Sequence, residues 1–450
     1  FIMRLKSTNG AREKKGFLYM KVTLDKENRF LTKEGLLDIK RELIYAGTKA
    51  AWCFKDGTAT PENIRNMPEI DLLRRGIETY INDHGTPDEH DKISLEITEF
   101  PKLMCMILNS EHQYTACERS FRYTKITTND YISDIEVKLY NKWYNIFINI
   151  FEENYSEWFY QVNQKNEKNT KTDMRKKAQE NARYFVSVLT PTSIAYSAPW
   201  YQWQKLATFL QDMIENPNTS LKKIVVPYAK EFIEQLIELK VVVLTKDAIA
   251  LYPPLEKMLK EKNDNREWLY KNNKETKLYM FAENNPFSGI NKPNEYNASI
   301  NYNSRLSIAG FADILRHRTS YVALKNPNEF SYIIPKFVPS NYWKEYDQDM
   351  QKINGIYPQG QLIDFNLDSS IYRLVQYMGK ERACERPQQE VEDWYVNQLL
   401  PDIVKGLSKR PEYEEEYKLL RTRYLDKCRC AYPNYHCPNP CGHPRTKRPF

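Results

Sequence analysis

The 450-residue sequence lacks any run of apolar residues long enough to cross a membrane. A membrane helix needs about 18 uninterrupted apolar residues, whereas segments such as 143–151 (WYNIFINIF) are short and contain Asn. The first residues, FIMRLKSTNGAREKK, are too basic and too broken for the apolar part of a signal peptide. We therefore expect a cytoplasmic protein that contacts no membrane.

Glycine is also scarce, with 14 residues in the chain. Neither G-x-G-x-x-G nor G-x-x-x-x-G-K-[ST] occurs, which argues against the phosphate-binding loops of Rossmann and P-loop proteins. Any nucleotide must then be held in another way, and Arg and His are the side chains best suited to this. The net charge of +7, from 66 basic and 59 acidic residues, suits an anionic small molecule as well as a nucleic acid.

The eight cysteines fall into two groups. Four are scattered through apolar or mixed stretches, as expected of reduced thiols in or near a core: Cys53, Cys105, Cys117 and Cys384. Four others lie in the last 23 residues: Cys428, Cys430, Cys437 and Cys441. With His436 and His443 they provide enough ligands for a tetrahedral zinc ion, although the spacing departs from the common paired CxxC arrangement. A flexible reduced tail is the alternative, and metal analysis separates the two.

Length and hydrophobic periodicity predict more than one folding unit, because the chain is about three times the usual domain size. Residues 19–30 start as a strand. Apolar residues at helical spacing predict helices over about 135–150 and 221–239. The polar run 162–176 has the composition of an exposed connection.

The second half repeats this order of elements. Residues 240–251 are strand-like, and Ile308, Phe311 and Leu315 mark a helix that ends in Arg316-His317-Arg318. A strand and a helix are expected over 361–379, and a further helix over 382–400, up to Pro401. We therefore expect an α/β (α+β) fold with two homologous repeats, each a sheet packed with long helices. The expected boundaries are an N-terminal extension (1–18), two repeats (19–239 and 240–427) and a Cys-rich tail (428–450).

Three clusters carry residues suited to chemistry. They are HGTPDEH (84–90), ERSFRYTK (118–125) and the triplet Arg316-His317-Arg318. Each has a simple structural explanation when taken alone: a solvated turn, a surface patch of ion pairs, and an exposed basic helix end. In the second cluster, however, Ser120 and Arg122 offer a hydroxyl and a planar guanidinium, which are suited to phosphate binding.

Taken together and in order, these clusters resemble the flavin-dependent thymidylate synthases, also called thymidylate synthase complementing proteins. That family carries His-x-Thr-Pro-x-Glu-His, then Arg-His-Arg with Ser-x-Arg-Tyr beyond it, then Ala-Arg before Leu-Pro. Two further segments continue the likeness, ENARYFVSVLTP (180–191) and IYRLVQYMGKERACERPQQEVE (371–392). The resemblance covers most of residues 19–400 and implies two tandem thymidylate synthase-like domains.

The two halves depart from the family pattern in complementary ways. In the first, Asn109-Ser110-Glu111-His112 stands where the family has Arg-His-Arg. The second keeps that triplet, but ALKNPNEFSY (323–332) replaces the Ser-x-Arg-Tyr ending and Asn354-Gly355 replaces Ala-Arg. If two repeats of one chain replace two subunits of the family's tetramer, one complete site per pair suffices. We therefore expect a homodimer that corresponds to that tetramer, with composite sites built from the two repeats.

The resemblance implies reductive methylation of dUMP to dTMP, in a bacterial cell or a virus-infected host cell. FAD is the cofactor, and NADPH and methylenetetrahydrofolate are the co-substrates. The catalytic positions are Arg382, whose guanidinium would stabilise charge on the pyrimidine carbonyls, and His84. The substrate-binding positions are Glu118, Ser120, Arg122, Arg183, Arg316 and Asp313. The cofactor-binding positions are Arg316, His317, Arg318, Arg373, Thr86, Glu89 and Cys53.

Two alternatives remain open. The family commonly has Gln where this chain has Asp313, and a carboxylate accepts from an amino group, so another pyrimidine such as dCMP, or a hydroxymethylation, is one alternative. The other is a noncatalytic nucleic-acid-binding descendant, suggested by 32 Tyr interleaved with basic residues. This second alternative is the weaker, because Tyr and Arg fall on helical and motif positions and not on a sheet platform.

Overall fold

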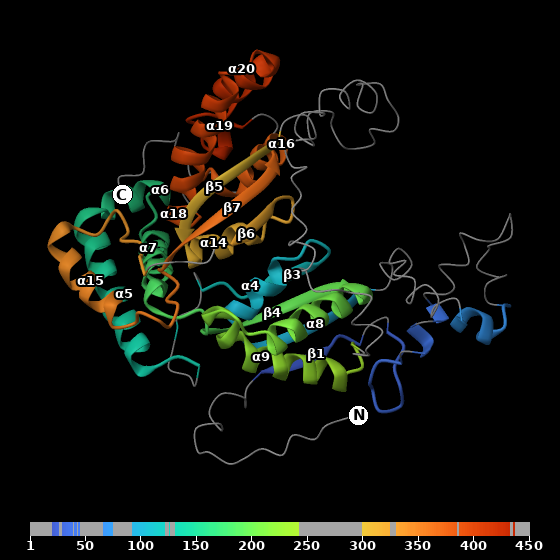
Figure 1. Cartoon of the computed structure of the whole chain (residues 1–450). Coiled ribbons are helices and arrows are strands. Elements are labelled where there is room, and N and C mark those ends of the chain that lie inside the picture. Colours follow the sequence, from blue (N-terminus) through green and yellow to red (C-terminus); the bar gives the residue numbers. More distant parts are fainter. Residues whose placement is uncertain are drawn as a thin grey trace. The chain divides into compact units, whose positions relative to one another are not determined.

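The computed structural model of the chain contains two compact units (Figure 1). Unit 1 comprises Phe1–Arg119 and Pro191–Lys262, and unit 2 comprises Ser120–Thr190 and Asn263–Phe450. The structure describes residues 20–26, 29–38, 40–42, 44–45, 66–74, 92–121, 126, 131–242, 299–324, 330–384, 387–432 and 435–436. Within these ranges, no helix is both long enough and apolar enough to span a bilayer.

Unit 1 is built on a four-stranded antiparallel sheet in the order β1-β2-β4-β3. Its strands are β1 (Lys21–Leu24), β2 (Lys92–Pro101), β3 (Thr115–Glu118) and β4 (Pro191–Pro199). Alternate residues of β2 are buried, as expected when only one face of a sheet meets the core. The helices are α4 (Lys102–Asn109), α8 (Trp200–Glu215) and α9 (Ser220–Glu238).

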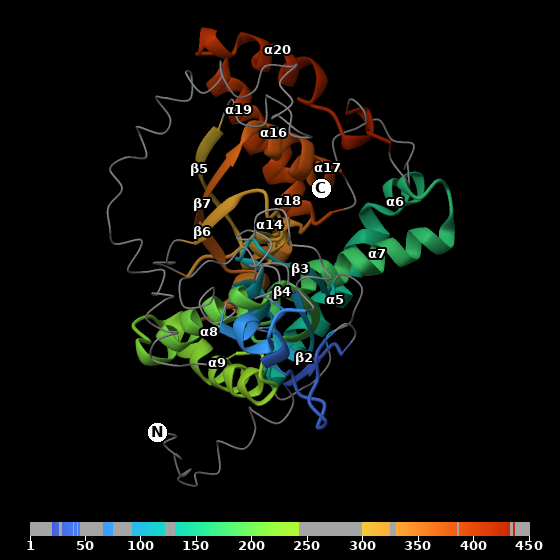
Figure 2. The ribbon, with the colours of Figure 1, turned by 90° about the vertical axis from the view of Figure 1, so that its right-hand side faces the viewer.

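Unit 2 contains a three-stranded antiparallel sheet in the order β5-β7-β6. The strands are β5 (Ser299–Ser307), β6 (Tyr321–Leu324) and β7 (Leu362–Ser370). Helix α14 (Ile308–Leu315) follows β5, and α16 (Ile371–Arg373), the π-helical η7 (Leu374–Met378) and α17 (Gly379–Arg382) follow β7. They are followed by α18 (Gln389–Trp394), the π-helical η8 (Tyr395–Leu399), α19 (Leu400–Leu407) and α20 (Glu414–Arg423). Figure 2 shows α16, α17 and α18 on one face of this sheet.

A second layer of unit 2 is helical and comes from two distant parts of the chain. Its elements are α5 (Asp134–Asn154), α6 (Ser156–Val162), α7 (Glu167–Ala182), η3 (Arg183–Phe185), η6 (Ser340–Tyr342) and α15 (Trp343–Gln351). Aromatic rings join them: Trp143 stacks on Phe185 at 5.2 Å and meets Tyr346 edge-on at 4.8 Å between ring centroids. Residues 120–190, which the sequence assigned to the first repeat, therefore pack with residues of the second half.

The two units repeat one order of elements: strand, eight-residue helix, short strand, and later a central strand followed by helices. In each unit, the last of these three strands along the chain lies between the other two in the sheet, which gives the orders β2-β4-β3 and β5-β7-β6. The turn between helix and short strand also has the same length, residues 110–114 and 316–320. Ser110-Glu111-His112 thus takes the place in unit 1 that Arg316-His317-Arg318 takes in unit 2.

Most elements expected from periodicity are present, and two expectations were wrong. Helices α5, α9 and α14 match the expected segments, and the mixed helix and sheet class is confirmed. Residues 162–176 are not a connection, because α7 begins at Glu167, where the Asn166 side chain accepts a hydrogen bond from Asn169 N at 3.0 Å. The helix expected over 382–400 begins only at Gln389, and it does not end before Pro401: Pro401 is the second residue of α19, which directly follows a π-helical turn. Most of 240–251, from residue 243 on, lies outside the described residues.

Candidate functional site

The Arg-His-Arg triplet lies on a turn whose backbone is fixed at both ends. Helix α14 is capped at its start by Ser307, whose Oγ accepts from Gly310 N at 3.0 Å. After the helix, His317 N donates to Ile314 O at 2.9 Å, and Ser320 N donates to His317 O at 2.9 Å. Arg316 and His317 are partly buried there, whereas Arg318 is exposed.

Arg382, at the end of α17, reaches this turn and is 8% exposed. Its Nε donates to His317 Nε2 at 2.9 Å, and its Nη2 donates to the backbone oxygen of Asp313 at 2.8 Å. Its Nη1 lies 3.9 Å from the Asp313 carboxylate oxygen Oδ2. Three residues that the resemblance assigns to one site, and that lie up to about 70 positions apart in sequence, thus meet in unit 2.

Burial and the neighbouring guanidinium groups favour the neutral form of the His317 imidazole. Burial lowers the pKa of its imidazole to about 3, with the neighbouring charges of Arg382 and Arg316 acting in the same direction and Asp313 opposing them. The hydrogen bond from Arg382 has the same consequence, because a protonated Nε2 cannot accept. The positive charge at this turn therefore comes from Arg316, Arg318 and Arg382.

Arg373 supports the same turn from α16. Its backbone N–H donates to the capping Ser370 Oγ at 3.2 Å, which places the side chain on the first turn of the helix. Its Nη1 lies 3.4 Å from Thr319 O and donates to it. The resemblance assigns Arg373 to the cofactor, and the structure places it against the backbone of the segment that holds the triplet.

Glu118 lies in unit 1, in a buried ion pair that the sequence did not indicate. Its carboxylate accepts from Lys102 Nζ at 2.5 Å and from Asn109 Nδ2 at 3.1 Å, and the Lys102 and Glu118 side chains are 8% and 2% exposed. The equivalent positions of unit 2 are all apolar: Ile308, Leu315 and Leu324. Unit 1 thus carries a polar cluster at positions where unit 2 is apolar.

Arg183 lies in a buried polar cluster of unit 2 and is 5% exposed. Its Nη2 donates to Gln388 Oε1, while its Nε has no hydrogen-bond partner among the described residues. Gln388 Nε2 donates to Tyr184 Oη at 2.8 Å, and Tyr184 Oη donates to Glu390 at 3.1 Å. Burial raises the pKa of the Glu390 carboxyl, although hydrogen bonds from Ser307 and Tyr184 oppose this.

This buried cluster was missed by sequence reasoning apart from Arg183. Glu390 also accepts from Ser307 N at 2.5 Å, and a side chain at Gly310 would meet its carboxylate at 3.0 Å. Lys177 Nζ donates to Pro387 O at 2.6 Å and lies 3.3 Å from Glu180. The sequence carries these residues as the run PQQE at 387–390, at the start of an apolar helix. Because Gln and Glu are usually exposed, the run by itself did not predict a buried cluster.

The remaining predicted residues are placed as follows. Ser120 is partly buried in unit 2, next to Phe121, which is buried. Arg122, His84, Thr86, Glu89 and Cys53 lie outside the described residues, as do Cys437 and Cys441. Cys428 is buried and Cys430 exposed, and in the part of the chain that the structure describes no three His, Cys, Asp or Glu side chains are grouped as a metal ion requires.

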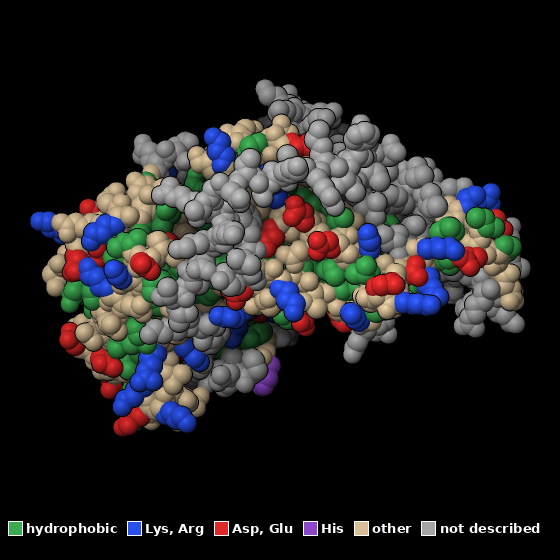
Figure 3. All heavy atoms as spheres, turned by 90° about the horizontal axis from the view of Figure 1, so that it is seen from below, with side chains coloured by type: hydrophobic (Ala, Val, Ile, Leu, Met, Phe, Trp, Pro, Cys, Tyr) green, Lys and Arg blue, Asp and Glu red, His purple; other side chains and the backbone are tan. Residues whose placement is uncertain are grey.

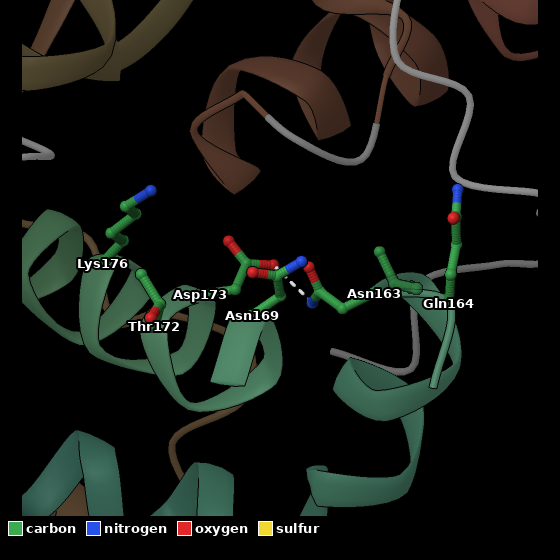
Figure 4. Close-up of a pocket in the computed structure, with 7 residues that line it drawn as sticks. Asn163, Gln164, Asn169, Thr172, Asp173 and Lys176 are labelled. Carbon is green, nitrogen blue, oxygen red and sulfur yellow. Dashed lines mark hydrogen bonds between the residues drawn. The ribbon is translucent and has the colours of Figure 1, made fainter. Parts of the chain in front are cut away.

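A separate pocket of about 260 Å³ lies where α6 meets α7 in unit 2 (Figure 4). Asn169, Thr172, Asp173 and Lys176 line it from one face of α7, and Asn163 joins Asp173 through a hydrogen bond of 3.2 Å. The lining is almost entirely polar, and none of the predicted site residues takes part. Small-molecule sites are mostly apolar with a few polar groups, so this pocket lacks the character of a cofactor site.

No protein-family model matches the chain, and no curated protein is significantly similar to it in sequence.

Proposed function

We propose that the chain is a flavin-dependent thymidylate synthase that converts dUMP to dTMP with methylenetetrahydrofolate and NADPH. One observation carries the proposal. The residues that the resemblance assigns to one site converge on one turn of unit 2: Asp313, the triplet Arg316-His317-Arg318, Arg373 and Arg382. Ser120 and Arg183, proposed to bind the substrate, belong to the same unit.

The residues at this turn fit an anionic cofactor such as FAD. The turn follows the C-terminal end of α14, where the helix dipole is negative and does not attract anions. Attraction must therefore come from guanidinium groups, and Arg316 and Arg318 provide two of them. Bound there, the flavin would carry hydride from NADPH to the transferred carbon.

Arg382 has the properties required of a group that stabilises developing negative charge on a pyrimidine carbonyl. Such a group must be fixed before the reaction and shielded from water, because reorientation during the reaction costs free energy. The guanidinium is fixed at Nε and Nη2 and is nearly buried. Nucleotide phosphate held by Ser120, Arg122 and Arg183 would supply binding energy that positions the base.

Each unit lacks some family motif residues that the other unit keeps. This supports an internal duplication in which the two halves have taken different roles. The basic turn of unit 2 corresponds to Ser110-Glu111-His112 in unit 1, where Glu111 accepts from Gln202 at 2.7 Å. Burial raises the pKa of the Glu111 carboxyl. The Ser110-Glu111-His112 turn has no guanidinium group for an anionic cofactor, so we propose one working site per chain and two per homodimer.

The reaction is tested by product mass after incubation with dUMP, methylenetetrahydrofolate labelled at the methylene carbon, NADPH and FAD. We expect labelled dTMP, and dCMP in place of dUMP should give no product. A labelled product from dCMP, or a product one oxygen atom heavier than dTMP, would show that another pyrimidine or hydroxymethylation is the true activity.

A noncatalytic nucleic-acid-binding role is the second candidate, and the described surfaces argue against it. Stacking platforms need aromatic side chains beside basic ones. The sheet face of β5 and β7 that points away from the core is polar and partly acidic, with Asn301, Asn303, Asp364, Asn366 and Asp368. Arg305 on this face is paired with Asp364, and the neighbouring β6 adds the exposed Tyr321. On the molecular face shown in Figure 3, Lys and Arg are interspersed with Asp and Glu. Salt-sensitive binding of single-stranded DNA by a colourless protein would favour this candidate instead.

A further inference from the structure

We infer that His317 is a positioning residue, a neutral imidazole that holds Arg382 in one orientation by accepting its Nε–H at Nε2. The resemblance assigns His317 to the cofactor and treats the triplet as a cationic group. The inference rests on the proposed function only for what Arg382 does; the orientation itself follows from the contacts.

Two hydrogen bonds fix the plane of the guanidinium. Arg382 Nε donates to His317 Nε2 at 2.9 Å, and Nη2 donates to Asp313 O at 2.8 Å. Since the guanidinium is planar, anchoring two of its nitrogens removes rotation about the last bond of the side chain. The acceptors come from the last turn of α14 and the loop after it, so the orientation of Arg382 depends on that helix end.

The direction of the hydrogen bond sets the protonation state of His317. Arginine remains charged and can only donate, so Nε2 must be the unprotonated nitrogen and the proton must lie on Nδ1. The charged groups that face the imidazole are Arg382, Arg316 and Asp313. A proton added to Nε2 would remove the acceptor and place two like charges 2.9 Å apart.

Asp313 completes the arrangement, since its carboxylate lies 3.9 Å from Arg382 Nη1. A carboxylate at position 313 could also accept a hydrogen bond from the amino group of a cytosine-like base. Its place beside Arg382 gives it a different role, as the counter-charge of the guanidinium. This is consistent with a uracil substrate, which has a carbonyl where cytosine has the amino group.

Nuclear magnetic resonance of the full chain with ¹⁵N-labelled histidine tests the inference without any ligand. Two-bond ¹H–¹⁵N spectra report the tautomer of each of the six histidines, and the His317 signal is to be assigned by its loss in His317→Gln. We expect the Nδ1–H tautomer and no titration between pH 8 and pH 5. A cationic His317 near pH 6, or the Nε2–H tautomer, would overturn the inference.

Two substitutions separate the contact from general effects. Arg382→Met removes the donor and the charge, so the titration of His317 should move upward. Arg318→Met, the matched control, removes an exposed cation of the same turn and should leave the His317 signal unchanged. Equal shifts in both variants, or none in either, contradict a specific contact.

Nucleotide binding then distinguishes this inference from the proposed function. We expect His317→Leu to weaken dUMP binding by about 10- to 150-fold, as loss of a charged hydrogen bond does. His317→Gln, which keeps an acceptor, should retain most of the affinity, and His317→Leu should add little in the Arg382→Met background. If the tautomer is as expected but Arg382→Met binds dUMP normally, the positioning contact stands and the proposed role of Arg382 fails. If His317→Gln weakens binding as much as His317→Leu, the acceptor role is wrong.

Discussion

Replacement of Lys102 by Ile, the residue at the equivalent position of unit 2, tests whether the two units correspond residue by residue. In unit 1, Lys102 Nζ lies 2.5 Å from the Glu118 carboxylate, and both side chains are almost fully buried. Removal of one partner leaves an uncompensated buried charge, which costs about 3–5 kcal/mol of stability. We therefore expect Lys102→Ile to lower the free energy of unfolding of unit 1 by about that amount.

Unit 2 shows how the loss is compensated. At the equivalent positions it has Ile308 and Leu315, which are 5% and 8% exposed, and Leu324, which is 39% exposed. Replacing a whole buried ion pair by apolar residues of similar volume is often neutral or stabilising. The triple variant Lys102→Ile, Asn109→Leu, Glu118→Leu should therefore recover most of the stability that Lys102→Ile loses.

Urea unfolding of the full chain, followed by circular dichroism and by tryptophan fluorescence, measures both effects. Lys40→Ile is the control, because Lys40 and Glu69 form an exposed ion pair with side chains 60% and 61% exposed, and its loss should change little. A triple variant as unstable as Lys102→Ile would refute the equivalence of the two sets of positions. A stable Lys102→Ile variant would refute the buried ion pair itself.

Three further predictions follow from single residues. Arg122→Ala should weaken dUMP binding by about 1.5–3 kcal/mol if Arg122 makes the proposed charged hydrogen bond, and an unchanged affinity in calorimetry would remove it from the site. Burial, with the charge of Glu234 nearby, raises the pKa of the Glu231 carboxyl to about 7, so the free energy of unfolding falls as pH rises from about 4.5 to 7. Glu231→Gln should therefore gain more stability at pH 8 than at pH 5, and equal gains at the two pH values would contradict the raised pKa. Burial acts to raise the pKa of the Asp349 carboxyl, but hydrogen bonds from Lys142, Lys352 and Trp143 outweigh burial, and the pKa is lowered. The stability that Asp349 contributes should be present above about pH 3.8 and be lost in stronger acid. If Asp349→Asn unfolds in acid at the same pH as the wild type, the lowered pKa is wrong.

Local patterns predicted the elements whose apolar faces are regular. The spacing of Ile308, Phe311 and Leu315 predicted α14, but the helix ends at Leu315, and the triplet expected at its end lies on the turn that follows. Helix α7 was missed because its composition is polar. Only a few of its side chains, such as Met174 and Ala178, contribute apolar surface to the core, while its cap at Asn166 was not recognised.

Long-range packing was beyond reach of the sequence pattern. Nothing in residues 120–190 indicates that Trp143 and Phe185 pack against Tyr346, which lies about 200 and 160 positions further on, respectively. The same holds for buried polar partners. Arg382, His317 and Asp313 were named from motif likeness, but Lys102, Asn109 and Gln388 become visible only when burial and hydrogen bonding are known.

The visible spectrum of the purified protein, with and without dUMP, tests the central claim most directly. We expect a yellow protein, or one that becomes yellow with FAD, whose flavin absorbance is bleached by NADPH and altered by dUMP. Titration should give two equivalents of FAD and two of dUMP per two chains. A protein that binds no flavin would contradict the proposed function, and four equivalents per two chains would contradict the division of roles between the units.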